Sequence, residues 1–176
     1  MEHLKKMIRN IPNFPSPGII FRDITTVLKE ADGLNMAVNA MADSLKGVDF
    51  DLILGPESRG FIFGVPLAYK LKKGFVPARK TGKLPAETVR KAYDLEYAQA
   101  EIEIHKDAVS CNHKVVIVDD LLATGGTAKA VADLVTELGA YVVGMTFLIE
   151  LESLKGREML TGYDNIKSIL VYGSSN

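Results

Sequence analysis

The sequence has a single cysteine, Cys111, among 176 residues, and it has no long apolar run. One cysteine cannot form a disulfide within the chain, and this usage is typical of proteins from a reducing compartment. No apolar stretch approaches the roughly 20 residues of a membrane span. The polar residues 1–6 do not lead into the apolar region of a signal peptide. We therefore expect a soluble, cytoplasmic protein with no membrane partner.

An excess of charge of either sign is also missing, because 21 Lys and Arg stand against 22 Asp and Glu, a formal net charge of −1. Proteins that bind nucleic acid through its phosphates usually carry a basic excess, so we expect no nucleic-acid partner. The content of 47% apolar and 24% charged residues is that of a globular protein and excludes a disordered chain. An anionic ligand would have to be bound by positive groups gathered locally.

Several signatures of nucleotide binding and catalysis are absent. Residues 55–60 have the glycine spacing of a Walker loop, but Phe61 and Ile62 follow where Lys and Ser or Thr are required. No Gly-x-Gly-x-x-Gly segment occurs, and Ser58 lacks the first glycine of a nucleophile elbow. The three histidines show no metal-ligand spacing and are expected at the surface: His3, His105 and His113.

Apolar runs alternate with helical periodicities along the chain. Runs without polar alternation predict strands covered on both faces, as in a parallel sheet, over residues 51–54, 75–78, 114–118 and 142–149. Apolar stripes predict helices over 34–45 and 131–138, the second ending at Gly139. We predict an α/β fold with a mostly parallel central sheet flanked by helices, and the length predicts a single domain over 1–176.

Two stretches interrupt this alternation. Three prolines within 10–18 forbid a helix and predict a stiff extended loop after a short amphipathic N-terminal segment. The stretch 80–106 is polar, contains Gly82 and Pro85, and then alternates at 101–104. It predicts a mobile loop followed by antiparallel strands.

The most informative segment follows the predicted strand 114–118. This strand ends on two adjacent carboxylates, Asp119 and Asp120, at the carboxyl end where α/β sheets bind ligands. A run rich in glycine and hydroxyl groups then opens a helix: Ala123, Thr124, Gly125, Gly126 and Thr127. Its backbone N–H groups, its hydroxyls and the positive end of the helix can together hold a phosphate without Lys or Arg.

The alternative for this segment is a capped helix after a strand, with both aspartates on a solvated turn. The aspartate pair argues against it, because two carboxylates beside a phosphate would repel that anion unless they bind something else. The hydroxyls of a ribose and a hard divalent cation are the natural candidates for Asp119 and Asp120.

Residues 119–127 resemble the phosphoribosyl-diphosphate signature of the type I phosphoribosyltransferases, in particular of those that act on adenine. Further segments agree with that family: residues 14–24, 57–61, 79–85, 95–97 and 152–158. The resemblance runs from Ile11 to Tyr172 in matching order and spacing. It implies the type I phosphoribosyltransferase fold, with a small N-terminal hood over residues 1–30 and a mobile antiparallel loop.

The resemblance implies that the protein transfers the phosphoribosyl group of 5-phosphoribosyl 1-diphosphate to adenine, with Mg²⁺ as cofactor. The products would be AMP and diphosphate, as in purine salvage, and the enzyme would be a homodimer. Two alternatives remain: a transferase for another purine base, and a regulator that senses phosphoribosyl diphosphate without turnover. The hood residues Phe21 and Arg22 argue against the first. The lack of an added DNA-binding segment or basic face argues against the second.

The family's motifs imply roles for individual residues. Residues 123–127 would hold the 5′-phosphate, while Asp119 and Asp120 would face the ribose hydroxyls and Mg²⁺, directly or through water. The diphosphate loop would consist of Glu57, Ser58, Arg59 and Gly60, with a cis peptide expected near Glu57–Ser58. Basic residues on the mobile loop would close over the leaving diphosphate: Arg79, Lys80 and Lys83.

The resemblance also implies an adenine site in the hood. Backbone groups of Ile20 and Arg22 would pair with the adenine edge, the Phe21 ring would stack on the base, and Leu151 would form the opposite wall. A 6-oxo purine would then leave buried donors or acceptors unpaired.

Three residues are implied in catalysis itself: Glu96, Tyr97 and Arg59. Glu96 would move the proton of the purine imidazole, and Tyr97 would shield the site or contact the diphosphate. Arg59 offers planar donors for phosphate oxygens. No covalent nucleophile is needed, because the attacking nitrogen belongs to the base.

Overall fold

The structure, a computed structural model, describes residues 1–94 and 99–173. It divides into two compact units, Met1–Ala40 and Met41–Asn176. The first unit contains the predicted hood, residues 1–30, and runs on to Ala40; the single domain over 1–176 stays a prediction. No helix of the described residues is long and apolar enough to cross a membrane.

The first unit is built around a small antiparallel hairpin. Strand β1 (Arg9–Pro12) pairs with β2 (Ile20–Asp23), with Arg9 opposite Asp23 and Pro12 opposite Ile20. The helices of this unit are α1 (Glu2–Met7), α2 (Thr25–Leu28) and the first part of α3 (Ala31–Ser44). The loop predicted over 10–18 is therefore partly strand. Proline is tolerated at Pro12 because an edge position does not require its N–H.

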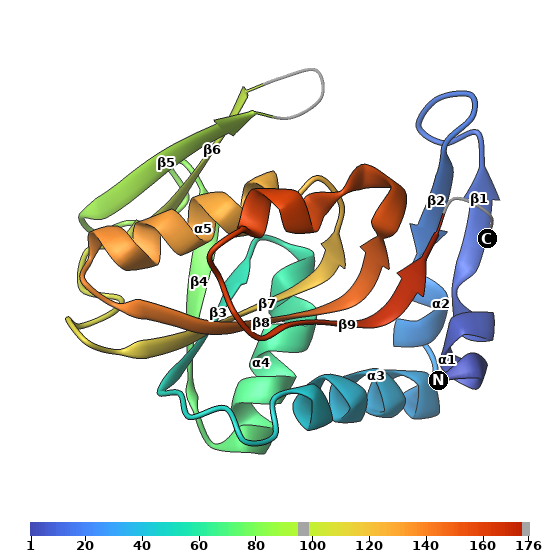
Figure 1. The fold of residues 1–176 in the computed structure, drawn as a ribbon, viewed down its shortest axis with the longest axis horizontal. Helices are drawn as coiled ribbons and strands as arrows, with labels where there is room; N and C mark the ends of the chain where they lie inside the picture. The colour runs from blue at the N-terminus through green and yellow to red at the C-terminus, as the bar shows by residue number, and fades with distance from the viewer. Residues whose placement is uncertain (95–98, 174–176) are drawn as a thin grey trace. The chain divides into compact units, whose positions relative to one another are not determined.

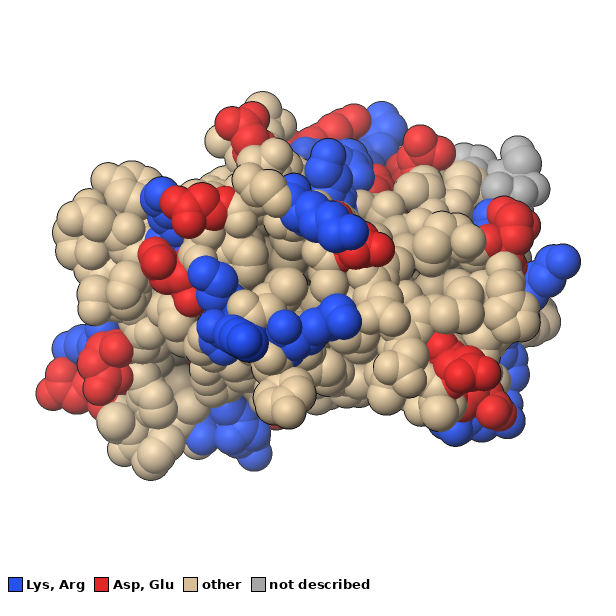
Figure 2. Space-filling view, turned by 90° about the horizontal axis from the view of Figure 1, so that it is seen from below, with Lys and Arg blue, Asp and Glu red and all other residues tan. Residues whose placement is uncertain are grey.

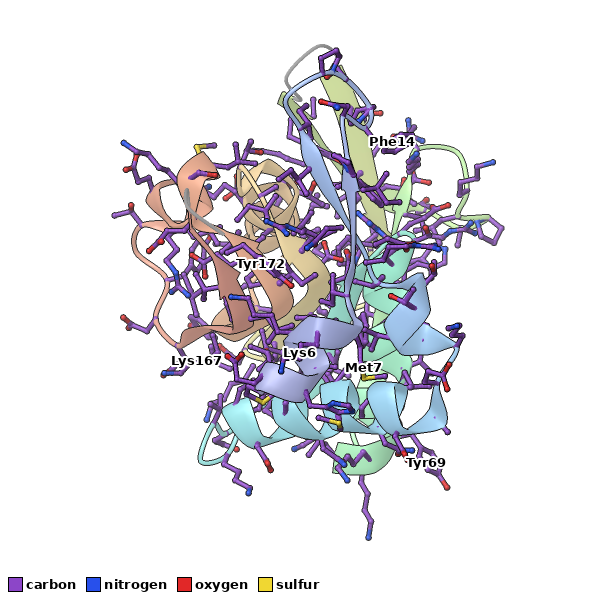
Figure 3. The ribbon with its side chains drawn as sticks, turned by 90° about the vertical axis from the view of Figure 1, so that its right-hand side faces the viewer. Lys6, Met7, Phe14, Tyr69, Lys167 and Tyr172 are labelled. Atoms are coloured by element: carbon purple, nitrogen blue, oxygen red, sulfur yellow. The ribbon has the colours of Figure 1, made fainter. Side chains whose placement is uncertain are left out.

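Asp23 ties this hairpin to α2. Its carboxylate accepts hydrogen bonds from the backbone N–H of Thr25 (2.9 Å), the Arg9 Nε (3.0 Å) and the Thr25 hydroxyl (2.8 Å). These bonds, that of the Thr25 backbone first, lower the pKa of Asp23 to about 2. At the hairpin turn, labelled at Phe14 in Figure 3, the rings of Phe14 and Phe21 pack edge to face with centroids 5.3 Å apart.

The described residues of the second unit form a seven-stranded sheet in the order β5-β6-β4-β3-β7-β8-β9 (Figure 1). The strands are β3 (Leu52–Pro56), β4 (Gly74–Lys80), β5 (Thr88–Asp94), β6 (Gln99–His105), β7 (Lys114–Leu122), β8 (Tyr141–Leu151) and β9 (Ile166–Tyr172). The five neighbouring strands β4, β3, β7, β8 and β9 run parallel, whereas β6 pairs antiparallel with both β4 and β5. The predicted α/β class is confirmed, and the antiparallel strands predicted within 80–106 are β5 and β6.

Two helices cover opposite faces of this sheet (Figure 1). Helix α4 (Arg59–Leu71) connects β3 to β4, and α5 (Gly126–Glu137) connects β7 to β8. The chain thus moves in opposite directions across the sheet from the neighbouring strands β3 and β7. Since such crossovers share one hand, the helices fall on different faces and a crevice opens between the carboxyl ends of β3 and β7.

The core lies around β7 and β8. Val115, Val116, Ile117 and Val118 have no exposed surface, which explains why their segment shows no polar alternation. Helix α5 packs on this sheet through a buried apolar stripe: Val131, Leu134 and Val135. Gly139 follows the helix with φ +80°, in agreement with the predicted stop.

Helix α4 is not predicted by the sequence pattern. It contains Gly60, Gly64 and Pro66, which are poor residues for a helix interior. The glycines allow close packing instead: a Cβ at Gly64 would lie 2.5 Å from the Phe75 ring, and one at Gly60 would lie 3.0 Å from the Val118 carbonyl oxygen. The tertiary contacts with β4 and β7 therefore stabilise a helix that local propensity disfavours.

Surface charge is mixed. On the face drawn in Figure 2, Lys and Arg lie in small groups interspersed with Asp and Glu. This distribution agrees with the balanced composition of the chain.

Candidate functional site

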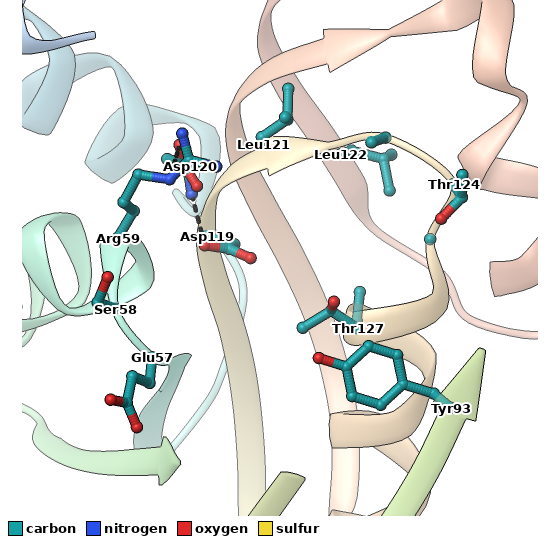
Figure 4. Close-up of a pocket in the computed structure, with 13 residues that line it drawn as sticks. Glu57, Ser58, Arg59, Tyr93, Asp119, Asp120, Leu121, Leu122, Thr124 and Thr127 are labelled. Atoms are coloured by element: carbon teal, nitrogen blue, oxygen red, sulfur yellow. Dashed lines mark hydrogen bonds and ion pairs between the residues drawn. The ribbon is translucent and has the colours of Figure 1, made fainter. Parts of the chain in front are cut away.

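A pocket of about 240 Å³ lies at the carboxyl ends of β3 and β7, the crevice that the topology creates (Figure 4). Its lining comes from the loop after β3, from the end of β7 with the start of α5, and from β5. The lining residues are Glu57, Ser58, Arg59, Tyr93, Asp119, Asp120, Leu121, Leu122, Ala123, Thr124, Gly125, Thr127 and Ala128. Nine of these thirteen are predicted site residues, so the fold brings together the two principal motifs.

Two carboxylates and one guanidinium form the polar centre of the pocket. Asp120 is 5% exposed at its side chain, and its Oδ2 lies 3.1 Å from the Arg59 Nε. The backbone N–H of Asp120 donates to Asp119 Oδ1 at 2.9 Å. Burial and the neighbouring charge of Asp120 raise the pKa of Asp119 well above its usual value. Burial also raises the pKa of Asp120, although Arg59 opposes this effect.

The loop 123–127 presents backbone N–H groups at the start of α5. Gly125 has φ +85°, a conformation that residues with a Cβ rarely adopt. Its own Cβ would lie 2.4 Å from the carbonyl oxygen of Gly156, and a Cβ at Gly156 would lie 2.3 Å from that of Ala123. The loop is therefore packed backbone against backbone on the segment that holds Gly156. Gly126, the first residue of α5, is not among the lining residues.

That supporting segment consists of two short 3₁₀ turns, η1 (Glu152–Leu154) and η2 (Gly156–Leu160). Arg157 donates to the buried Glu150 at the end of β8 through Nε and Nη2, both at 2.8 Å. Its Nη1 donates to the carbonyl oxygen of Ile166 at 3.1 Å. A two-pronged Arg–carboxylate pair has fixed geometry, so Arg157 anchors Gly156 to the sheet.

The loop after β3 begins with a cis peptide between Glu57 and Ser58, as expected. Glu57 accepts hydrogen bonds from Arg79 Nε (3.1 Å), Arg79 Nη2 (3.4 Å) and the backbone N–H of Lys80 (3.1 Å). The bond from Arg79 lowers the pKa of Glu57 despite its partial burial. Gly60 is buried below this loop, and a Cβ there would also lie 3.1 Å from Asp119 Oδ1.

The other predicted residues that fall within 1–94 and 99–173 are not among those lining the pocket. Arg79 pairs with Glu57 at its edge, Lys80 is the exposed last residue of β4, and Lys83 lies on the exposed turn that follows. Leu151 is half-buried at the end of β8. Glu96 and Tyr97 lie outside the described residues.

The predicted hood residues belong to the first unit. Ile20, Phe21 and Arg22 lie on β2, where Ile20 is exposed and Arg22 Nη1 donates to Asn10 Oδ1 at 2.6 Å. Their role in base binding stays a prediction.

Sequence reasoning missed Tyr93, which lines the pocket from β5 and lies beside Thr127 in Figure 4. Val89 and Tyr93 both pack on the core, and Lys91 between them lies 3.9 Å from Asp133 of α5. In the sequence, the only sign of this role is that residues 89, 91 and 93 lie on one face of a strand. That sign indicates a pocket residue only once β5 is known to cover α5.

Comparison with known proteins supplies the family. Residues 26–169 match the family model of the phosphoribosyl transferase domain. The chain is 56% identical over 172 residues to the adenine phosphoribosyltransferase of Lachnoclostridium phytofermentans, covering 98% of each chain.

Solved structures agree. The adenine phosphoribosyltransferase of Thermoanaerobacter pseudethanolicus has a TM-score of 0.94 and 56% identity, covering 97% of this chain and 99% of that one. The Saccharomyces cerevisiae enzyme, complexed with an imino-altritol bisphosphate and adenine, has a TM-score of 0.89 and 39% identity, covering 96% and 97%. The chain therefore belongs to the phosphoribosyltransferase family and, within it, to the adenine phosphoribosyltransferases.

Proposed function

We propose that the protein catalyses the reaction of adenine with 5-phosphoribosyl 1-diphosphate to give AMP and diphosphate, in the cytoplasm and with Mg²⁺. The observation that carries this proposal is the pocket itself, in which Asp119 and Asp120 stand beside the loop 123–127 at the switch point of the sheet. The yeast relative that was solved with adenine supports the choice of base.

In this proposal the 5′-phosphate binds the loop 123–127. Backbone N–H groups at the start of α5 and the hydroxyls of Thr124 and Thr127 would donate to its oxygens, and the positive end of the helix favours an anion there. The positive φ of Gly125 supports this role, because it turns the backbone at the point where the helix begins.

The two carboxylates would serve the ribose hydroxyls and Mg²⁺. Residues 1–94 and 99–173 contain no group of three or more His, Cys, Asp or Glu that could hold a metal ion by themselves. A pair of carboxylates suits Mg²⁺, which is commonly bound by one or two carboxylates together with substrate phosphates. When bound, Mg²⁺ would neutralise charge on the diphosphate. Asp119 and Asp120 would orient the sugar beneath the attacking base.

The diphosphate would leave toward the opposite wall of the pocket. Ser58, Arg59 and the backbone near Gly60 would contact it, and Arg59 offers a planar fork of donors for phosphate oxygens. The basic residues Arg79, Lys80 and Lys83 would stabilise the charge that develops on it. The closeness of Arg79 to Glu57 at the pocket edge supports this assignment.

Adenine would bind against the hood. The backbone of Ile20 and Arg22 would pair with its edge, Phe21 would stack on it, and Leu151 would form the other wall. Glu96 would take the proton released as the purine nitrogen bonds to the ribose carbon, and Tyr97 would cover the reacting atoms. The attacking electron pair comes from the base, so no side chain is needed as a nucleophile.

The proposed activity is tested by incubating the protein with phosphoribosyl diphosphate, Mg²⁺ and one of four bases: adenine, hypoxanthine, guanine or xanthine. We expect diphosphate release to be at least about tenfold faster with adenine, because each buried polar group left unpaired by another base costs about 1–3 kcal/mol. Preference for a 6-oxo purine would contradict the choice of base. Binding of phosphoribosyl diphosphate without turnover of any base would favour a regulator.

We also propose that the enzyme is a homodimer that uses an exposed face of α4. Ile62, Val65 and Tyr69 are spaced at three and four residues and lie on one side of this helix, where they are 36, 50 and 88% exposed. An apolar stripe of this kind is typical of an interaction surface. Its place directly after the loop 57–60 would bring the second subunit near the active site.

Charges on this stripe should dissociate the dimer. For the double variant Val65→Glu, Tyr69→Glu we expect a monomer in sedimentation velocity, because two carboxylates cannot be buried without partners. Lys70→Glu adds negative charge to the same helix outside the stripe and should remain dimeric. A monomeric wild type at assay concentration would contradict the proposal.

A further inference from the structure

A buried carboxylate lies outside the pocket, against the turn that carries Lys83 and directly follows the other predicted basic residues, Arg79 and Lys80. Glu103 on β6 has no exposed surface, although carboxylates are almost never fully buried unless they are paired. Its Oε1 accepts hydrogen bonds from three consecutive backbone N–H groups, those of Gly82 (2.9 Å), Lys83 (3.2 Å) and Leu84 (3.2 Å). Successive N–H groups that converge in this way form an anion-binding concavity.

The second oxygen of this carboxylate is used by β5. Oε2 accepts a hydrogen bond from the Thr88 hydroxyl at 3.1 Å and lies 3.1 Å from the Arg90 Nε. Burial alone would raise the pKa of Glu103, but the backbone and hydroxyl donors outweigh it and hold the pKa below its usual value. Glu103 is therefore charged at neutral pH, with both oxygens engaged by donors.

The turn bound by Glu103 leads to the pocket through a continuous set of hydrogen bonds. The carbonyl oxygen of Lys83 accepts from Arg79 Nη1 at 3.2 Å, and Arg79 Nε donates to Glu57 Oε2 at 3.1 Å. Glu57 lines the pocket. Glu103 is also the register partner of Arg79 where β4 and β6 pair, so one buried residue fixes both ends of the segment 79–84.

We propose that Glu103 is a positioning residue for diphosphate binding. It holds the turn 81–84 against β6, so that Arg79, Lys80 and Lys83 are presented to the diphosphate of the substrate. This inference rests on the proposed function, because it assumes that the basic segment contacts that diphosphate.

The direction of the change in substrate affinity distinguishes a positioning role of Glu103 from a direct effect of its negative charge. A carboxylate near a diphosphate repels it, so removal of the charge alone would tighten substrate binding. Loss of the hydrogen bonds has the opposite effect, because the freed turn no longer presents its basic groups. A weaker affinity after Glu103 is replaced must therefore come from the lost position of the turn.

Glu101 provides a matched control on the same strand. It lies two residues away on the same face of β6 and also contacts this turn, through a hydrogen bond of 2.7 Å from the Thr81 hydroxyl. It is exposed and binds one side chain rather than three backbone groups. Glu101→Ala removes the same charge from nearly the same place without releasing residues 82–84.

The test compares Glu103→Ala, Glu103→Gln and Glu101→Ala in steady-state kinetics. We expect Glu103→Ala to raise the KM for phosphoribosyl diphosphate about tenfold. This is the loss expected when one charged side chain can no longer donate a hydrogen bond to the diphosphate. The KM for adenine should change little, whereas kcat should also fall, because the displaced basic residues also stabilise the charge that develops on the leaving diphosphate. Glu103→Gln keeps an acceptor for the turn and should restore most of the affinity, and Glu101→Ala should resemble the wild type.

Hydrogen exchange provides a readout that does not depend on activity. We expect the amides of Gly82, Lys83 and Leu84 to lose protection in Glu103→Ala and to keep it in Glu101→Ala. A fall in kcat with unchanged KM values and a lower melting temperature would mean that Glu103 only stabilises the fold, and would overturn the inference. An unchanged KM with unprotected amides would overturn it as well. If the wild type releases no diphosphate with any base, the proposed function fails, whereas the exchange result still reports on the turn.

Discussion

The double variant Asp119→Asn, Asp120→Asn should lose about 10²- to 10³-fold in kcat, by analogy with the removal of other preorganised electrostatic groups. Both residues line the pocket, and they are its two carboxylates beside the loop 123–127. In the proposed reaction they orient the ribose and hold Mg²⁺ while positive charge develops at the sugar. Asparagine keeps the shape of each side chain and one acceptor oxygen, but it replaces the other oxygen with an NH₂ donor and removes the charge. Diphosphate release with adenine measures the effect.

Thermal melting separates this electrostatic role from a structural one. Burial raises the pKa of both carboxylates, so at neutral pH the charged forms are disfavoured in the folded state relative to the unfolded state. Removing the charges eliminates that penalty, and the loss of the ion pair with Asp120 costs little because the Arg59 side chain, which is 40% exposed, can be solvated by water instead. We therefore expect the double variant to melt no lower than the wild type. A variant with unchanged turnover would refute the assignment, and one that melts much lower would show that the carboxylates support the fold.

Asp133 offers a matched control for this experiment. It lies on α5, the helix that begins within the loop 123–127, and it forms ion pairs with Lys129 and Lys91. It does not line the pocket. Asp133→Asn makes the same chemical change on the helix that follows these aspartates in the chain, and it should leave kcat unchanged.

The phosphate-site motif could be predicted because its signals are local. Asp119 and Asp120 end a fully apolar strand, and the glycines that follow determine the backbone at the start of α5. Residues that are neighbours in the sequence therefore carry the signal that identifies this motif. The meeting of this segment with 57–59 was also predictable, because both follow strands of one parallel sheet.

The rest of the fold and site depends on contacts between distant residues. Helix α4 contains Gly64 and Pro66, so its local propensity argues against a helix, and only the close approach to Phe75 explains the glycine. Tyr93 reaches the pocket because β5 covers α5. Glu103 reads as one member of an alternating strand until its partners at 82–84 are known. The residues in each of these contacts are too far apart in the sequence for a helical or strand periodicity to connect them.

The segment 152–158 illustrates the same limit and leads to a further prediction. Its resemblance to the family was evident in the sequence, but no role followed from it. In the structure Gly156 lies against the loop 123–127, and the pair between Arg157 and Glu150 holds it there. Gly156 does not have a positive φ, so what forbids a side chain at this position is the neighbouring loop and not the backbone conformation.

Gly156→Ala should therefore lower kcat/KM for phosphoribosyl diphosphate about 100-fold, since a misplacement of about 1 Å in a binding loop can have that effect. The new methyl group would lie 2.3 Å from the carbonyl oxygen of Ala123, a distance at which the backbone must move. Gly144→Ala is the control: its Cβ would meet its nearest neighbours at 3.6 Å, an ordinary contact, and its activity should be close to that of the wild type. If the loop 123–127 binds the 5′-phosphate, Gly156→Ala should weaken the binding of AMP but leave that of free diphosphate unchanged. Equal losses of affinity for AMP and diphosphate would mean that the whole pocket has been distorted. Unchanged kinetics would show that the loop can move without affecting activity, and therefore that it does not hold the phosphate rigidly.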